Sequence, residues 1–228
     1  MKILFACDLD GTLIHSYKKF RDGDICVEIY DGHEQSFISP RALDLLKKIS
    51  AQIDFVPITT RSIAQYRRIF WTEDFRPKVA VVANGSYLLD GDEQKNFLRD
   101  FVDEEISREL ETLREKFSTD DRFNICRIVD ESFLFLRRSD DFDGEISFDT
   151  NLTVGQTGKK IYLFPPRLNK GEALKKLSEK FPADKIFCAG DSEIDFPMLE
   201  LADEAFGFKF TPFDNAEDFL QRILERLP

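Results

Sequence analysis

The chain has 228 residues, of which 42% are hydrophobic and 33% are charged, and its net charge is −11 at pH 7. This length suits one large domain, or a core domain with a smaller insertion. The acidic surface argues against nucleic acid or anionic lipid as partners, so an anionic substrate needs local cations or a metal ion. No apolar stretch reaches the ~20 residues of a membrane span, and no N-terminal signal is visible. With four scattered cysteines, we expect a cytoplasmic protein with reduced thiols.

The first third of the chain alternates apolar strands with helices. Apolar runs predict buried strands over 3–7, 53–58 and 79–83. A hairpin is expected over 25–37, and Ser39-Pro40 predicts the start of a helix.

The pattern changes after residue 85. Apolar residues recur at helical spacing over 100–117, and the segments 122–129 and 133–138 alternate like half-buried strands. A polar stretch follows over 139–158. We expect a small α+β unit over 86–159.

The last third returns to the first pattern. Strands are expected over 161–164, 185–189 and 204–208, and helices over 170–180 and 214–226. Apolar strands that alternate with helices indicate a parallel sheet covered on both faces. The predicted fold is therefore α/β, with a Rossmann-like parallel core of residues 1–85 and 160–228 and an α+β cap inserted between them.

Polar residues follow several of the expected strands directly. Asp8 and Asp10 come after the first strand, Thr59 after the second, and Asp191 after a later one. Ligands bind beyond the carboxyl ends of parallel strands, so these side chains are expected in one crevice. Crowded carboxylates repel one another unless a cation neutralises them, and oxygen-only ligands favour Mg²⁺.

Lys170 stands at the first position of an expected helix. Asn169 and Glu172 form a capping-box pattern around it. A cation at a helix N-terminus opposes the helix dipole, which makes sense if Lys170 pairs with an anion there. The alternative is a solvated lysine.

Four segments together resemble the motifs of the haloacid dehalogenase superfamily, in the same order. They are "DLDGTL" at 8–13, "ITT" at 58–60, "NKGEAL" at 169–174 and "GDSEIDFPML" at 190–199. An insertion between the second and third segments resembles the type 2 caps of the Cof-like and sucrose-phosphate-phosphatase-like branches. Ile194 departs from the Cof-like pattern, which usually has Asn at this position.

The resemblance implies a role for each motif residue. Asp8 would attack phosphorus, and Asp10 would act as general acid and then as general base. Thr59 and Lys170 would hold the phosphoryl oxygens. Mg²⁺ would be held by Asp8, the backbone carbonyl of Asp10, Asp191 and, directly or through a neighbouring group, Asp195. Thr59 has an alternative interpretation as a strand-end hydroxyl or a helix cap, and Asp195 has one as a helix cap.

Further residues are expected at the substrate. Gly11 permits the turn after the first motif, and backbone N–H groups nearby can hold phosphate. The full set of expected substrate contacts is Gly11, Thr12, Thr60, Arg61, Asn84, Gly85, Arg137 and Arg138. Arg137 and Arg138 have a second interpretation as solvated surface charges.

The expected function is a Mg²⁺-dependent phosphatase that hydrolyses a small phosphorylated metabolite, a sugar phosphate by family analogy, through an aspartyl-phosphate. One alternative is a phosphomutase of the phosphomannomutase-like type. Another is a phosphate-responsive signalling module that does not hydrolyse its phosphate. The expected assembly is a monomer or a homodimer.

Overall fold

The centre of the molecule is a parallel sheet with the strand order β14-β13-β1-β5, seen in a computed structural model that describes residues 1–228. A parallel bridge between Ile58 and Val81 places β6 beside β5. The predicted α/β class is thereby confirmed. The sheet strands are β1 (Ile3–Cys7), β5 (Asp54–Pro57), β6 (Val79–Val82), β13 (Lys185–Ala189) and β14 (Glu204–Phe206).

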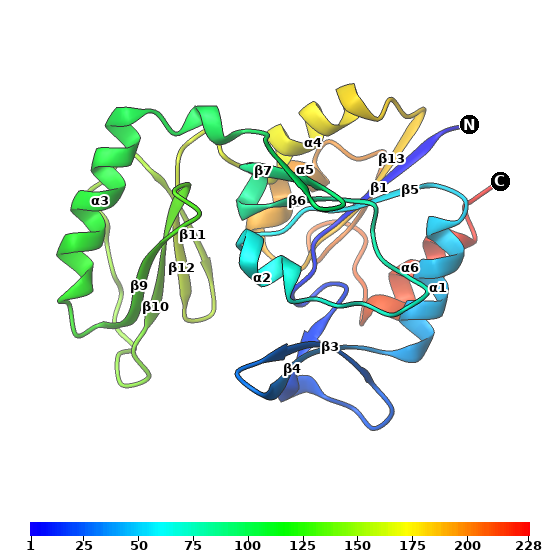
Figure 1. Ribbon diagram of the computed structural model, residues 1–228, viewed down its shortest axis with the longest axis horizontal. Helices are drawn as coiled ribbons and strands as arrows, with labels where there is room; N and C mark the ends of the chain where they lie inside the picture. Colours follow the sequence, from blue (N-terminus) through cyan, green and yellow to red (C-terminus); the bar gives the residue numbers. More distant parts are fainter.

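Helices cover both faces of this sheet (Figure 1). Helices α1 and α6 pack against each other on one face, and α4 packs against α5 on the other. Ser39 caps α1 as predicted, because its hydroxyl accepts a hydrogen bond from the Ala42 N–H at 3.1 Å. The helices are α1 (Pro40–Ser50), α2 (Ile63–Arg67), α4 (Lys170–Lys180), α5 (Phe196–Leu199) and α6 (Ala216–Leu224).

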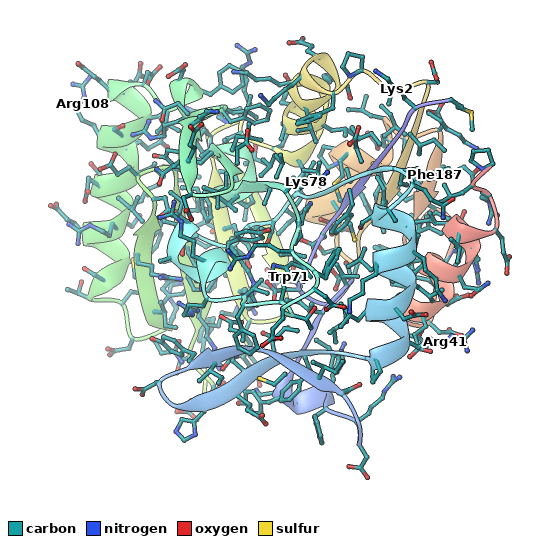
Figure 2. All side chains as sticks on the ribbon, turned by 45° about the vertical axis from the view of Figure 1, so that its right-hand side comes forward. Lys2, Arg41, Trp71, Lys78, Arg108 and Phe187 are labelled. Atoms are coloured by element: carbon teal, nitrogen blue, oxygen red, sulfur yellow. The ribbon has the colours of Figure 1, made fainter.

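Phenylalanine side chains fill much of the interior. The ring of Phe5 lies 5.3 Å from that of Phe55, measured between centroids, and Phe213 lies 4.9 Å from Phe219. In Figure 2, Trp71 and Phe187 lie among the core side chains, whereas Arg108 and Arg41 point outward. None of the helices is long and apolar enough to span a bilayer.

A small antiparallel sheet follows β1 and lies below the core in Figure 1. Its strands are β2 (His15–Ser16), β3 (Ile25–Tyr30) and β4 (His33–Ile38), and a 3-10 turn, η1 (Tyr17–Lys19), lies between the first two. Its β3–β4 hairpin is the one expected over 25–37. The Phe70 N–H donates to the Val27 carbonyl at 3.0 Å, so the hairpin is tied to the segment that follows α2.

A second unit, which we call the cap, consists of one helix on a four-stranded antiparallel sheet of order β11-β12-β10-β9. The sheet lies between helix α3 and the core (Figure 1). Helix α3 buries Leu110, Leu113 and Phe117, three of the positions expected from helical spacing. The elements are α3 (Glu104–Ser118), β9 (Phe123–Val129), β10 (Phe133–Arg138), β11 (Thr153–Thr157) and β12 (Lys160–Phe164).

Three strands pair differently from the expectation. The segment 161–164 was expected in the parallel core, but β12 pairs antiparallel with β10 and β11. Four of the five residues of β12 are buried, so its sequence looks like that of a parallel core strand. At the other end of the expected insertion, β7 (Tyr87–Asp90) follows the 3-10 turn η2 (Ala83–Gly85) and pairs antiparallel with core strand β6, and β8 (Glu93–Asn96) pairs antiparallel with β7. A further 3-10 turn, η3 (Arg99–Phe101), leads into the cap.

Candidate active site

The ends of the core strands bring the motif residues together, as the sequence predicted. Asp8 extends strand β1, and its N–H donates to the Ala189 carbonyl at 2.9 Å. Thr59 follows β5, and its N–H donates to the Val81 carbonyl at 2.9 Å. Asp8 and Thr59 are buried, whereas Asp191, after β13, is exposed. One edge of the sheet therefore carries a buried carboxylate beside a carboxylate that solvent can reach.

Lys170 lies at the centre of this group. It is the first residue of α4, and the Asn169 side chain caps the helix by accepting from the Glu172 N–H at 3.0 Å. The Lys170 ammonium is 1% exposed and lies 2.5 Å from carboxylate oxygens of both Asp8 and Asp195. Burial lowers the pKa of Lys170, but the charges of Asp195 and Asp8 raise it by more, so the side chain stays charged. The anion expected beside Lys170 is thus a pair of aspartates.

Asp8, Asp191 and Asp195 form a compact carboxylate cluster. One oxygen from each lies within 4.8 Å of the others. The pKa of Asp8 is raised to about 8, first by burial and then by the charges of Asp195 and Asp191, which together outweigh the opposing effect of Lys170. A divalent cation would relieve this repulsion, and a donor set of oxygen atoms alone suits a hard cation such as Mg²⁺.

Asp195 is held by hydrogen bonds to both of its carboxylate oxygens. One of its oxygens accepts from Lys170. The other accepts from both the N–H and the hydroxyl of Ser192, each at 2.9 Å. These bonds hold Asp195 at the 3-10 turn η4 (Glu193–Asp195), so it caps this turn and also belongs to the cluster.

Gly11 and Thr12 shape the turn after Asp8. Gly11 has φ +92°, and a Cβ at this position would collide with the Asp191 carboxylate. The Thr12 hydroxyl lies 3.4 Å from an Asp8 oxygen and 3.3 Å from an Asp191 oxygen. The small residue at position 11 therefore lets the turn approach Asp191 closely.

Asp10 lies outside the carboxylate cluster, where Arg61 binds both of its oxygens. Arg61 Nε and Nη2 each lie 2.7 Å from an Asp10 oxygen. Surrounding protein raises the pKa of Asp10, but the charge and hydrogen bonds of Arg61 outweigh this and lower it. Arg61 was expected to contact substrate; in the structure it is buried and pairs with Asp10 and Glu28 instead. The sequence did not indicate Glu28 as a partner, because it belongs to none of the motifs.

Thr59 and Thr60 differ in their surroundings. Thr59 is fully buried, and its hydroxyl accepts from the Arg61 N–H at 3.1 Å. The Thr60 side chain lies beside the hydroxyl of Tyr162, a residue of cap strand β12. Burial raises the pKa of Tyr162, and it lies near enough to Asp10 and Asp8 for their charges to raise it further. Sequence reasoning missed Tyr162 because it assigned 161–164 to the core sheet.

Asn84 and Gly85 lie at the end of β6. Asn84 is 1% exposed, and its Nδ2 donates to the Leu168 carbonyl at 2.9 Å, while its Oδ1 is buried without a partner. Asn84 also lines a cavity of about 430 Å³ between core and cap, together with Gly155, Asn169 and Ile194. Gly85 has φ +114° and packs closely on neighbouring side chains.

The two cap arginines reach different partners. Arg137 lies 3.2 Å from Asp140, and Arg138 lies 3.4 Å from the Gln156 side chain. In the sheet register Arg137 stands opposite Lys160, two residue pairs along from Phe135 and Tyr162. Arg137 thus shares a face of the cap sheet with the tyrosine that approaches the carboxylates.

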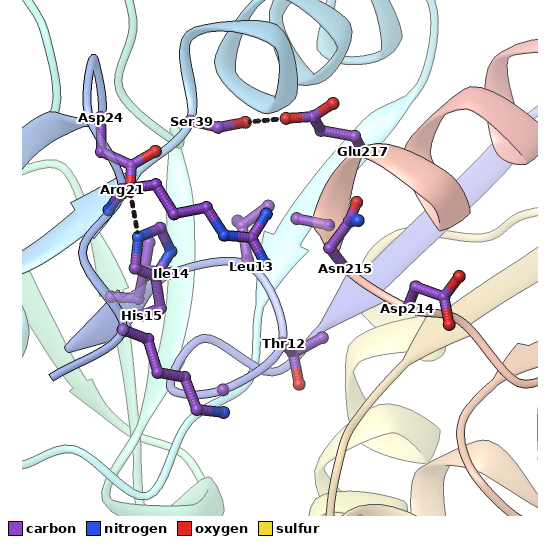
Figure 3. A pocket seen from close by; sticks show the side chains of 13 residues that line it. Thr12, Leu13, Ile14, His15, Arg21, Asp24, Ser39, Asp214, Asn215 and Glu217 are labelled. Atoms are coloured by element: carbon purple, nitrogen blue, oxygen red, sulfur yellow. Dashed lines mark hydrogen bonds and ion pairs between the residues drawn. The ribbon is translucent and has the colours of Figure 1, made fainter.

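A separate cavity of about 110 Å³ lies behind the first motif (Figure 3). Its wall contains Thr12 and an ion pair between His15 and Asp24 at 2.7 Å. Neither Asp8 nor Lys170 lines it. It is therefore distinct from the crevice that holds the carboxylates.

Comparison with known proteins agrees with this geometry. A family model described as haloacid dehalogenase-like hydrolase matches residues 5–138, which is more than half of the chain. The chain therefore belongs to the haloacid dehalogenase-like hydrolases, as its four motifs predicted. A comparison with curated proteins found no match.

Solved structures share the fold over nearly the whole chain. The sucrose-phosphatase of Synechocystis sp. PCC6803, in complex with sucrose and phosphate, has a TM-score of 0.64 at 15% identity, covering 99% of this chain and 98% of its own. The C-terminal domain of C. albicans trehalose-6-phosphate phosphatase has a TM-score of 0.62 at 15% identity, covering 99% and 90%. N-terminally truncated Plasmodium falciparum IMP-nucleotidase has a TM-score of 0.64 at 13% identity, covering 100% and 71%. At these identities the likeness concerns the fold alone.

Proposed function

We propose that this hydrolase is a Mg²⁺-dependent phosphatase that acts on a small phosphorylated metabolite through an aspartyl-phosphate. The observation that carries the proposal is the buried Asp8, which is paired with Lys170 and clustered with two further aspartates at the end of the parallel sheet. A carboxylate in this position has a cation on one side and lies beside the exposed Asp191. It is suited to attack a phosphate that arrives from the solvent side.

The two half-reactions can be assigned to Asp8 and Asp10. In the first, an Asp8 oxygen bonds to phosphorus, the bond from phosphorus to the leaving oxygen breaks, and Asp10 gives that oxygen a proton. In the second, water attacks phosphorus while Asp10 takes a proton from it, and the bond to Asp8 breaks to release phosphate. Lys170 and Thr59 hold the charged oxygens of the phosphoryl group throughout.

The oxygen atoms of Asp8, Asp191 and the Asp10 carbonyl would hold the magnesium ion, with Asp195 beside them. Bound there, the ion would neutralise charge on the phosphoryl oxygens. The carboxylate cluster fits this assignment, because three mutually close acids beside a single lysine leave negative charge uncompensated. Lys170 orients Asp8 and Asp195 by contacting an oxygen of each.

The cap supplies the surface that would meet the leaving group. Tyr162 lies next to Thr60, and the charge of Lys160 acts on Asp10. A hydroxyl and a cation on this side of the cap suit a polar leaving group with hydroxyl or anionic substituents. Sucrose-phosphatase and trehalose-phosphate phosphatases share the fold, which supports a sugar phosphate as the substrate class. The partner is thus a small metabolite, bound by a monomer or by each subunit of a homodimer.

The test is phosphate release from a panel of sugar phosphates and nucleoside monophosphates, with Mg²⁺ and with EDTA. Asp8→Asn should abolish release. Asp44→Asn, an exposed aspartate on α1, is the matched control and should behave as the native protein. Tyr162→Phe should raise KM for the best substrate. Release that persists in EDTA or in Asp8→Asn would overturn the proposal.

A further inference from the structure

Glu28 is a buried carboxylate outside every motif of the sequence. It is 1% exposed, although it lies in strand β3 of the small N-terminal sheet. Its neighbour Val27 is also buried, which regular alternation along a strand does not allow. The β3–β4 register shifts on both sides of Glu28, and such a bulge turns a side chain away from its regular direction. The bulge therefore directs Glu28 into the protein.

Three side chains donate hydrogen bonds to Glu28 there. The Ser36 hydroxyl donates at 2.7 Å, Arg61 Nη1 at 2.8 Å and Arg68 Nε at 3.1 Å. Two guanidinium groups thus share one buried carboxylate. The hairpin is itself fixed to the core beside Arg68, because Glu28 bridges Ile69 in a short antiparallel pairing. Glu28 is a rigid anchor and not a mobile surface charge.

Arg61 connects this anchor to Asp10. Its Nε and Nη2 bind the two Asp10 oxygens at 2.7 Å. The remaining N–H groups bind Glu28 at 2.8 Å, the Ser36 hydroxyl at 3.1 Å and the Gln65 carbonyl at 3.3 Å. All five donors of the guanidinium are therefore used. Because the group is planar, partners on one edge set the direction in which the other edge points.

Asp10 depends on this arrangement for its orientation. Its side chain is 42% exposed, and its only side-chain hydrogen bonds are those from Arg61. We propose that Glu28 is a positioning residue for Asp10, acting through Arg61, so that the hairpin sets the direction from which a proton reaches the leaving group. This inference rests on the proposed role of Asp10 as general acid. Glu28 itself touches neither substrate nor metal.

The experiment compares leaving groups, because an acid matters most where the leaving oxygen is most basic. Three probes serve for this: p-nitrophenyl phosphate, phenyl phosphate and benzyl phosphate, whose leaving groups become progressively more basic. The quantity measured is kcat/KM, which covers binding and the transfer step up to departure of the leaving group. The variants are Glu28→Gln, Glu28→Ala and the milder Ser36→Ala. Glu34→Gln, an exposed glutamate of the same hairpin, is the matched control.

For Glu28→Ala, kcat/KM should fall about 10- to 100-fold with benzyl phosphate and less than about 3-fold with p-nitrophenyl phosphate. Glu28→Gln and Ser36→Ala should show the same order of substrates with smaller losses, and Glu34→Gln none. Equal losses on all three probes, or no loss, would mean that Glu28 only ties the hairpin to the core, and would overturn the inference. If native protein and Glu34→Gln hydrolyse none of the probes while the Glu28 variants remain folded, the proposed phosphatase function itself fails. That outcome differs from a failure of the positioning role, in which native protein hydrolyses the probes. Ser36→Ala keeps the test decisive if Glu28→Ala does not fold.

Discussion

Asp8 should make the stability of the metal-free protein depend on pH in a predictable direction. Its pKa is about 8 in the fold, against 3.8 for a free aspartate, mainly because of burial and then because of Asp195 and Asp191. Between these values the folded protein keeps a proton that the unfolded chain has released. The free energy of unfolding therefore falls as the pH rises, by about 1.4 kcal/mol per pH unit.

Asp8→Asn removes this titration, so the variant should gain stability relative to the native protein as the pH rises. From about pH 5 to about pH 8 the relative gain should reach at most about 4 kcal/mol, since Lys170 and Asp195 readjust when Asp8 ionises. Below about pH 4, where both forms of Asp8 are protonated, the difference should be small. An asparagine can still accept from Lys170 through its side-chain oxygen, so the comparison isolates the charge.

The free energy of unfolding of the native protein and of Asp8→Asn is measured at each pH by urea unfolding in EDTA. The fluorescence of the single, buried Trp71 is the signal. Asp44→Asn is the control, because its side chain is 60% exposed and pairs only with Lys48. Mg²⁺ should flatten the native curve, since a cation favours the ionised carboxylate. Native and Asp8→Asn curves that stay parallel across this pH range would refute the reasoning.

Three further outcomes are expected. Lys170→Met should lower the free energy of unfolding by about 3–5 kcal/mol, because two buried carboxylates lose their counter-charge. Lys175→Met, on the exposed side of the same helix, should change the free energy of unfolding little. Equal effects of the two substitutions in urea unfolding would contradict this expectation. Gly11→Ala should abolish phosphate release, because the added Cβ meets the Asp191 carboxylate. The control is Gly91→Ala, which also stands at positive φ but in open space. It should lower the free energy of unfolding by about 1 kcal/mol and leave phosphate release intact. EDTA should abolish phosphate release and added Mg²⁺ should restore it; activity that is insensitive to chelation would argue against a metal at the carboxylate cluster.

The sequence predicted the part of the site that depends on strand order alone. A parallel sheet places the residues after its strands at one edge, so the proximity of Asp8, Thr59 and Asp191 followed from finding the strands. Lys170 could also be predicted, since a cation at a helix N-terminus is unfavourable without an anion nearby. In the structure that anion is the pair Asp8 and Asp195.

The remaining contacts depended on information that local patterns do not carry. Tyr162 belongs to β12, whose apolar sequence is compatible with either sheet, so the sequence did not indicate that it belongs to the cap and lies near Thr60. Glu28 lies in the expected hairpin, but the bulge that directs it inward leaves no local pattern in the sequence. Arg61 was expected at the substrate. The partners that use its donors, Glu28 and Asp10, lie 33 and 51 residues away in the chain, so no local pattern links them to Arg61.

The departure at Ile194 has a local explanation in the packing of the cap on the core. A Cβ at Gly155, in cap strand β11, would lie 3.1 Å from Ile194 Cγ1, so the two backbones approach as closely as this side chain allows. Ile194 therefore gives the core an apolar contact with the cap where a polar asparagine would need partners. Asp195 loses little by the exchange, because Ser192 already donates two hydrogen bonds to it and Lys170 a third. Ile194 thus serves the contact between core and cap, whereas the neighbouring Ser192 and Asp195 maintain the carboxylate cluster.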